Sequence, residues 1–135
     1  MKIFLDDYRI PLDAWMYMKE KQYQDRDWVI VKNYDEFVRL LNMTKPENIE
    51  RISFDHDLAP EHYAPKEHWI NYDAWEATQD FEFKTGLDCC DYFIEYMKKN
   101  NIKTLPKYSC HSKNIGRRIR ILHQLTHYRN GSTEI

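Results

Sequence analysis

The sequence predicts an α/β fold in which a parallel sheet of about four strands carries helices on both faces. Short apolar segments that can form strands alternate along the chain with longer segments whose apolar residues recur at helical spacing. This alternation is typical of parallel strands joined by right-handed helical crossovers. The length fits one domain over residues 1–135, and the content of only three glycines and five prolines argues against a disordered chain.

Four short segments are expected to form the strands. They are residues 2–5, 28–31, 51–55 and 107–110. The second is a β-branched run that is apolar on both faces, as expected for a strand buried in a parallel sheet. We expect the spatial order 2-1-3-4, which is one of the orders of doubly wound sheets.

Capping signals place the helices between these strands. Pro11 stands at the start of the first helical pattern, a position that proline favours. Asn33 with Glu36, and Thr85 with Asp88, each resemble a capping box at the start of a helix. We therefore expect one helix after each of the first three strands, the third of them delayed by a long connection.

The last helix follows the fourth strand, and Ser112 is expected to cap it. Its buried face is expected to consist of apolar residues at helical spacing, namely Ile115, Ile119, Leu122 and Leu125. Residues 113–129 carry lysine and arginine but no acid, which indicates local anion binding near this helix. Arg117 and Arg118 lie further into the helix, and we expect both at the surface.

The segment 58–84 is too long for a plain connection and shows no clear helical pattern. It is rich in tyrosine, tryptophan, histidine and proline. We expect it to be an inserted lid or binding loop. Its aromatic side chains can either stack on a nucleobase or pack the loop onto the sheet, and the sequence leaves both alternatives open.

The bulk composition excludes several classes of protein. A net charge of −2 does not fit a general binder of nucleic acid or anionic membranes. No apolar segment approaches the length of a membrane span, and the first residues lack a signal-peptide pattern, so we expect a cytoplasmic protein without a membrane partner. The three cysteines suit reduced thiols, and their spacing includes no Cys-x2-Cys pair that would indicate zinc.

Acidic residues end two strands that would be neighbours in the sheet. Asp6 and Asp7 follow the first strand, while Asp55 and Asp57 end the third. In a doubly wound sheet, ligands bind beyond the carboxyl ends of the strands where the strand order reverses, which is between these two strands. So much negative charge in one place favours a hard cation, and we expect all four aspartates to hold Mg²⁺ or another divalent cation.

A phosphate site is expected beside this metal, at the start of the last helix. A helix N-terminus offers free N–H groups and a positive dipole end, so Ser112, Lys113 and Asn114 are expected to bind substrate. His111 can exchange a proton near neutral pH, and Arg9 offers a bidentate fork for phosphate. Each also has an ordinary structural interpretation: His111 as a hydrogen-bonded turn residue, and Arg9 as a solvated partner of an acid.

Three motifs occur in the order of one known family. Residues 5–11 (LDDYRIP) have the form LDDxRxP, residues 53–58 (SFDHDL) have the form SxDxDL, and residues 111–114 (HSKN) have the form HSxN. Together with Thr85-Gly86, they resemble the cyclic-phosphate-processing receiver-like family, which is related to two-component response-regulator receivers. The resemblance implies a receiver or flavodoxin-like three-layer fold and the processing of cyclic phosphates on nucleotides or RNA ends.

The resemblance also implies roles for particular residues. Asp6, Asp7 and Asp55 are similar to the receiver acidic pocket that holds Mg²⁺. The motifs that distinguish this branch contain Arg9, Asp57, His111 and Ser112. The pair His111-Ser112 stands where ordinary receivers carry a lone serine or threonine, which weakens the interpretation of the chain as a phosphoacceptor.

The leading hypothesis is a metal-dependent phosphoesterase that acts on a cyclic or terminal phosphate of a nucleotide or RNA end. Asp55, His111 and Arg9 would be its catalytic residues, with His111 as general acid or base. The alternatives are a non-catalytic nucleotide-binding module and a signalling receiver phosphorylated on Asp55 or Asp57. No protein partner is evident, and either a monomer or a homodimer is expected.

Overall fold

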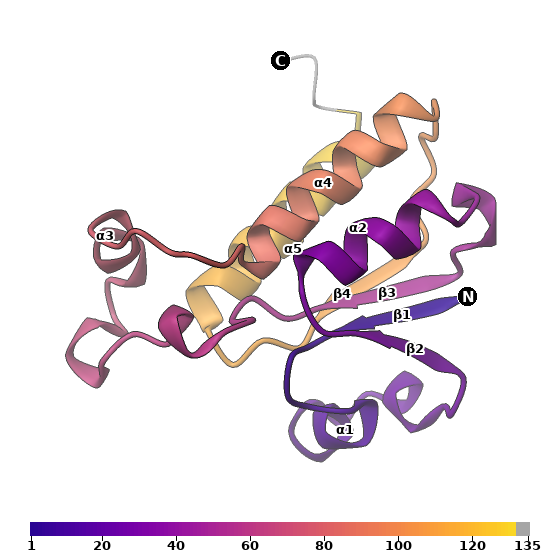
Figure 1. The fold of residues 1–135 in the computed structure, drawn as a ribbon. Helices are drawn as coiled ribbons and strands as arrows, with labels where there is room; N and C mark the ends of the chain where they lie inside the picture. The colour runs from indigo at the N-terminus through magenta and orange to yellow at the C-terminus, as the bar shows by residue number, and fades with distance from the viewer. Residues whose placement is uncertain (132–135) are drawn as a thin grey trace.

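The structure is a computed structural model that describes residues 1–131, and it contains one sheet of four parallel strands (Figure 1). The strands are β1 (Lys2–Leu5), β2 (Trp28–Val31), β3 (Arg51–Phe54) and β4 (Lys107–Cys110). Their order is β2-β1-β3-β4, and every neighbouring pair is parallel. The predicted fold class and strand order are therefore both confirmed.

Helices cover both faces of this sheet. The five α-helices are α1 (Pro11–Met18), α2 (Tyr34–Asn42), α3 (Tyr72–Ala77), α4 (Gly86–Lys99) and α5 (Ile115–Arg129). α1 lies on one face, while α2, α4 and α5 lie on the other (Figure 1). Asn33 caps α2 and Thr85 caps α4 through their side-chain oxygens, as the capping signals predict. No helix in the described part of the chain is both long and apolar enough to cross a bilayer.

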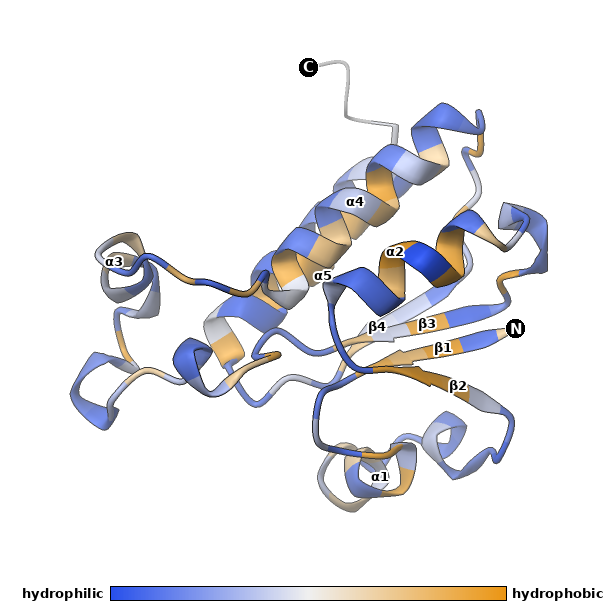
Figure 2. Cartoon of the chain, viewed as in Figure 1, coloured by the Kyte–Doolittle hydropathy of each residue, from blue (hydrophilic) through white to orange (hydrophobic). Residues whose placement is uncertain are grey.

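The larger apolar core fills the space between the sheet and helices α2, α4 and α5. Phe54 of β3 packs against Phe37 of α2 and Phe93 of α4, with ring centroids 5.9 and 6.0 Å apart. Figure 2 shows the apolar residues of α2 and α4 as stripes along these helices. Three reduced cysteines are buried in the same core, namely Cys89, Cys90 and Cys110.

A smaller cluster lies under α1 on the opposite face. It consists of Phe4, Ala14, Tyr23 and Trp28. Tyr23 belongs to the 3₁₀-helix η1 (Lys21–Gln24), which follows α1 and brings this side chain over the sheet. Its ring stacks on Trp28 and meets Phe4 edge-on, so the three rings fix one another.

The predicted buried face of the last helix is only partly correct. Ile115 and Ile119 are 60% and 63% exposed, whereas Arg117, Ile121 and Leu125 are buried. Leu125 was predicted correctly and Leu122 is half-buried against the core, so the buried stripe includes the predicted C-terminal positions but has Arg117 and Ile121 in place of Ile115 and Ile119. Asn114, rather than Ser112, is the N-cap, because its side chain accepts from the Arg117 N–H.

The connection 58–84 contains more regular structure than its sequence indicates. It includes two 3₁₀-helices, η3 (Pro60–His62) and η4 (Lys66–His68), as well as α3; one further 3₁₀-helix, η2 (Pro46–Asn48), lies before β3. The prediction of a segment without a helix is therefore wrong. α3 has only six residues and is held by tertiary contacts, among them the Tyr72 hydroxyl, which donates to the carbonyl of His62 at 2.6 Å.

Candidate functional site

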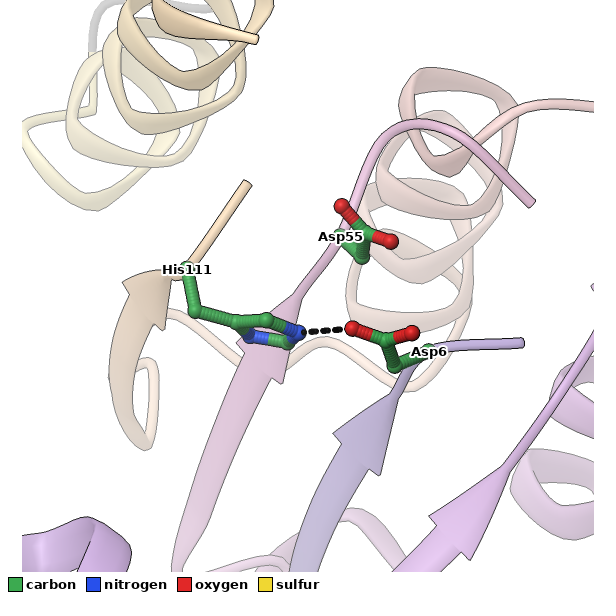
Figure 3. Close-up of side chains that lie close together, drawn as sticks. All are labelled: Asp6, Asp55 and His111. Atoms are coloured by element: carbon green, nitrogen blue, oxygen red, sulfur yellow. Dashed lines mark hydrogen bonds and ion pairs between the residues drawn. The ribbon is translucent and has the colours of Figure 1, made fainter. Parts of the chain in front are cut away.

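Three buried polar side chains meet where the strands end. Asp6, Asp55 and His111 are the residues directly after β1, β3 and β4, and each is at most 1% exposed. The backbone ladder continues through them, since the Asp55 N–H donates to Leu5 and the His111 N–H donates to Phe54. One ligand atom from each of the three lies within 4.8 Å of the others (Figure 3).

Asp6 is held as a carboxylate. Its Oδ1 accepts from the backbone N–H groups of Tyr8 and Arg9, both at 2.8 Å, and its Oδ2 lies 3.0 Å from Nε2 of His111. Burial acts to raise the pKa of Asp6, but the His111 contact and the two backbone donors outweigh it, so this pKa lies below its ordinary value.

Asp55 has the opposite electrostatic environment. Its Oδ1 accepts from the His56 N–H at 2.9 Å, but its buried Oδ2 has no hydrogen-bond partner among the described residues. Burial, followed by the charges of Asp6 and Asp57, raises the pKa of Asp55 well above its ordinary value. Two buried carboxyls with one oxygen unpaired match what a hard divalent cation requires of its ligands, so these residues fit such an ion.

Asp7 lies next to this group but outside it. Asp7 lies in the bend that follows β1, and its carboxylate is not one of the three groups whose ligand atoms converge. Its Oδ1 is buried without a hydrogen-bond partner in the described structure, and burial together with Asp6 raises its pKa. Asp7 is therefore a second unpaired carboxyl beside the predicted metal site.

His111 is fully enclosed by protein. It is 0% exposed, its ring stacks on Phe4 at 4.2 Å between centroids, and burial lowers its pKa while Asp6 acts against that shift. Its Nδ1 lies 2.7 Å from the hydroxyl of Ser53, while its Nε2 faces Asp6. With both ring nitrogens engaged inside the protein, the imidazole is suited to orient Asp6 rather than to touch a substrate.

Hydroxyl groups that the sequence motifs do not single out extend this contact beneath the site. The Ser53 hydroxyl lies 2.8 Å from that of Tyr23, which lies 3.0 Å from that of Ser109. The signal was present in the strand alternation, because Ser53 and Asp55 are two residues apart, as are Ser109 and His111. Ser53 and Ser109 are also cross-strand neighbours.

Asp57 lies apart from the group of Asp6, Asp55 and His111, at the start of α5. The Asn114 side chain acts to lower its pKa, and the Tyr72 hydroxyl lies 3.5 Å from its Oδ1. Burial raises its pKa to about 7. Ser112 is also buried there, where its hydroxyl accepts from the Asn114 N–H at 3.1 Å. The predicted substrate-binding residues Ser112 and Asn114 thus shape the turn into α5.

Two cations border the site on the side of α1. Arg9 Nη1 lies 3.6 Å from Asp6 and 3.9 Å from Asp55, and its guanidinium is 5.5 Å from the ring centroid of Tyr17. Lys113 Nζ lies 4.7 Å from the same ring, and the Tyr17 hydroxyl donates to the His111 carbonyl. Arg9, Tyr17 and Lys113 line a hollow of about 600 Å³. These cations are placed to attract an anion toward the aspartates.

A second polar cluster joins α3 to α5. Arg117 is 4% exposed and pairs with Glu76, and its Nη2 lies 3.4 Å from Asp73, which corrects the expectation that it is a surface residue. His56 Nε2 lies 3.4 Å from Glu76, and burial lowers the pKa of His56 to about 3. The aromatic segment 58–84 is thus anchored to α5 through the ion pairs that Asp73 and Glu76 form with Arg117, and no sequence motif predicted these pairs.

Comparison with known proteins agrees with this architecture. The family model of the cyclic-phosphate processing receiver domain matches residues 1–127. Neither the curated proteins nor the solved structures contain a match to the chain. The family match spans all four strands and the three residues that meet at their ends. The chain therefore belongs to the cyclic-phosphate processing receiver domain family.

Proposed function

We propose that this protein is a metal-dependent phosphoesterase that processes a cyclic or terminal phosphate of a nucleotide or RNA end. The observation that carries the proposal is the Oδ2 of Asp55, which is buried beside Asp6 at the strand ends without a hydrogen-bond partner in the described structure. Family membership supports the class of reaction, since the family is one of cyclic-phosphate processing.

Asp6 and Asp55 would hold Mg²⁺ or another divalent cation, with Asp7 as a neighbouring carboxyl whose Oδ1 is also unpaired. When bound, such an ion neutralises charge on phosphate oxygens and makes a water molecule more acidic. Without a cation, burial and like charge raise the pKa of Asp55 and so disfavour its carboxylate form. Acid should therefore weaken metal binding, because protons and the metal compete for the same oxygen.

Arg9 and Lys113 would bind the phosphate. The guanidinium of Arg9 lies close to both aspartates, so it can donate to a phosphate oxygen while remaining beside them. Lys113 has no carboxylate within 4.0 Å among the described residues, which leaves its ammonium group free for a second oxygen. Charge that develops on the phosphate would thus be neutralised on the α1 side of the site.

His111 has a different role in this proposal from the proton transfer that we expected from the sequence. Because it is fully buried and donates or accepts at both ring nitrogens, it would position Asp6. Asp57, whose pKa is raised to about 7, would help to fix the start of α5. No general acid is assigned among these residues.

The proposal is tested by assaying phosphate release from a nucleoside 2′,3′-cyclic phosphate and from RNA that ends in one, with Mg²⁺ and with a chelator. We expect turnover only with the metal, and a loss of at least about 100-fold in Asp55→Asn with an unchanged circular dichroism spectrum. Asp35→Asn, which changes an acid on the surface of α2, is the matched control. Equal turnover by Asp55→Asn and the native protein would contradict the proposal.

The unpaired Oδ2 of Asp55 also supports a second candidate function, that of a phosphoacceptor. Intact-mass analysis after incubation with acetyl phosphate and Mg²⁺ separates the two. A stable gain of one phosphate, absent in Asp55→Asn, favours the receiver role. Binding of a cyclic nucleotide without product would instead favour a non-catalytic module.

A further inference from the structure

We infer that Tyr23 and Ser53 are positioning residues for Asp6, which they reach through His111. The inference rests on the proposed function in one respect only, namely that Asp6 is a metal ligand. It assigns a role to a chain of side chains that lies beneath the site and has no direct access to a substrate.

The geometry of the chain is continuous. Three contacts link Tyr23 to Ser53, Ser53 to His111 and His111 to Asp6, at 2.8, 2.7 and 3.0 Å. All four side chains are buried, with residue exposures of 1% or less. Ser109, which is half-buried, lies 3.0 Å from the Tyr23 hydroxyl and completes the chain. Every distance is that of an ordinary hydrogen bond.

The strand pairing explains why these residues meet. Phe4, Ser53 and Ser109 are partners across β1, β3 and β4, and their side chains share the face that α1 covers. Two residues further along each strand are Asp6, Asp55 and His111, whose side chains point to the same face. The hydroxyls of Ser53 and Ser109 thus lie one step below Asp55 and His111, and Tyr23 enters from η1 to join them.

The direction of the hydrogen bonds follows from Asp6. A carboxylate only accepts, so Nε2 of His111 must carry the proton in this contact. In the neutral imidazole Nδ1 is then an acceptor, and the Ser53 hydroxyl donates to it. The Ser53 oxygen in turn accepts from Tyr23, whose oxygen accepts from Ser109. Each of the three hydroxyl groups therefore donates one hydrogen bond, and the directions along the chain are consistent.

This arrangement has a consequence for the site. A 180° flip of the His111 ring would put the carbons Cδ2 and Cε1 where Nδ1 and Nε2 now lie. The contacts of the ring with Ser53 and Asp6 oppose this flip, because both would be lost. The donor to Asp6 is therefore fixed in place before any ligand arrives. Outer contacts of this kind typically change metal affinity by about 10- to 100-fold when they are removed.

Nitrogen-15 NMR of the histidine rings in the metal-free protein tests the assignment without any assay of activity. We expect His111, identified by its absence in His111→Gln, to be protonated at Nε2 and bare at Nδ1. In Ser53→Ala the Nδ1 resonance should move to the position of a nitrogen that accepts no hydrogen bond. Ser53→Thr, which keeps the hydroxyl, should restore it. A proton on Nδ1 in the native protein would overturn the assignment.

Magnesium affinity, measured by isothermal titration calorimetry, tests the consequence. We expect the Kd to increase about tenfold or more in Ser53→Ala and about threefold in Tyr23→Phe, with recovery in Ser53→Thr. Tyr108→Phe is the control, because it removes a tyrosine hydroxyl that bonds to Thr126, away from the site. An unchanged Kd in both Ser53→Ala and Tyr23→Phe would overturn the inference. If the NMR and Kd results are as expected but the protein turns over no substrate, the proposed function is contradicted and this inference is not.

Discussion

The two faces of the sheet differ in what they bury. The face under α2, α4 and α5 is apolar, with phenylalanine, leucine, isoleucine and cysteine side chains in one continuous core. The face under α1 buries a few aromatic rings together with Ser53, His111, Asp6 and Asp55. The comparison teaches that the residues that form the main apolar core and the residues that form the site lie on opposite faces of the sheet. Strand alternation produces this separation, because it sends neighbouring residues to opposite faces.

Truncation of the apolar face should give the largest effect on stability. Phe93→Ala removes a fully buried ring of α4 that packs on Phe54, and we expect the free energy of unfolding to fall by about 3 to 5 kcal/mol. Urea denaturation measures this change. If the two faces are separate, the Mg²⁺ affinity of the folded fraction stays at the native value. A parallel loss of affinity would show that the faces are coupled.

Gly86 is the position where the two faces should be coupled. A Cβ there would lie 1.6 Å from the carbonyl oxygen of Asp55, and the Gly86 N–H donates to the His56 carbonyl. Gly86→Ala should therefore shift the start of α4 or the peptide of Asp55, at a cost of about 1 to 3 kcal/mol. Unlike Phe93→Ala, it should also weaken Mg²⁺ binding. Gly116→Ala, where the added Cβ meets only Asn114 at 3.9 Å, is the matched control.

Acid should destabilise the contact between α3 and α5 through His56. Its pKa is about 3 in the folded protein against 6.5 in the unfolded chain, so the unfolded chain binds a proton first as the pH falls. The stability that neutral His56 contributes is complete above pH 6.5 and is lost toward pH 3, at about 1 kcal/mol for each pH unit. The difference in free energy of unfolding between native protein and His56→Gln, measured from pH 7.5 to 5, should shrink accordingly. A constant difference would contradict the assignment.

On the polar face, removing a charge should increase stability in the absence of metal. Asp55 is buried with one unpaired oxygen, and its raised pKa means that ionisation opposes folding as the pH increases. Asp55→Asn should therefore raise the free energy of unfolding at pH 7 by about 1 kcal/mol in a chelator. With saturating Mg²⁺ the order should reverse, because only the native protein gains from binding. Thermal denaturation under the two conditions checks both signs.

The parts of the fold that the sequence predicts are those with local signals. The run at Trp28, the proline at position 11 and the caps at Asn33 and Thr85 specify strands and helix starts without reference to distant residues. Once the strands are known, the predicted strand order makes β1 and β3 neighbours, and their ends therefore bring Asp6 and Asp55 side by side. The resemblance of the three motifs to one family added the fold type, and the family match agrees with it.

The parts that the sequence did not predict depend on tertiary contacts. α3 has only six residues, which is too short to give a periodic signal. Arg117 pairs with Glu76, which lies 41 residues earlier in the chain, so its burial could not be predicted from its neighbours. The role of His111 could not be read from its neighbours either. Its orientation depends on Ser53, 58 residues away, and on how deeply the ring is buried. Alternation alone would have placed Ser53 below Asp55, but not Tyr23, because η1 gives no strand signal.

The three buried thiols provide an internal reporter of motion in the apolar core. Burial raises the pKa of Cys89, Cys90 and Cys110, so each is protonated and shielded from reagents in the closed protein. A thiol reagent can modify them only when the helices separate from the sheet. The rate of modification of the unaltered protein, with and without Mg²⁺, would therefore measure how far occupation of one face of the sheet restrains opening of the other.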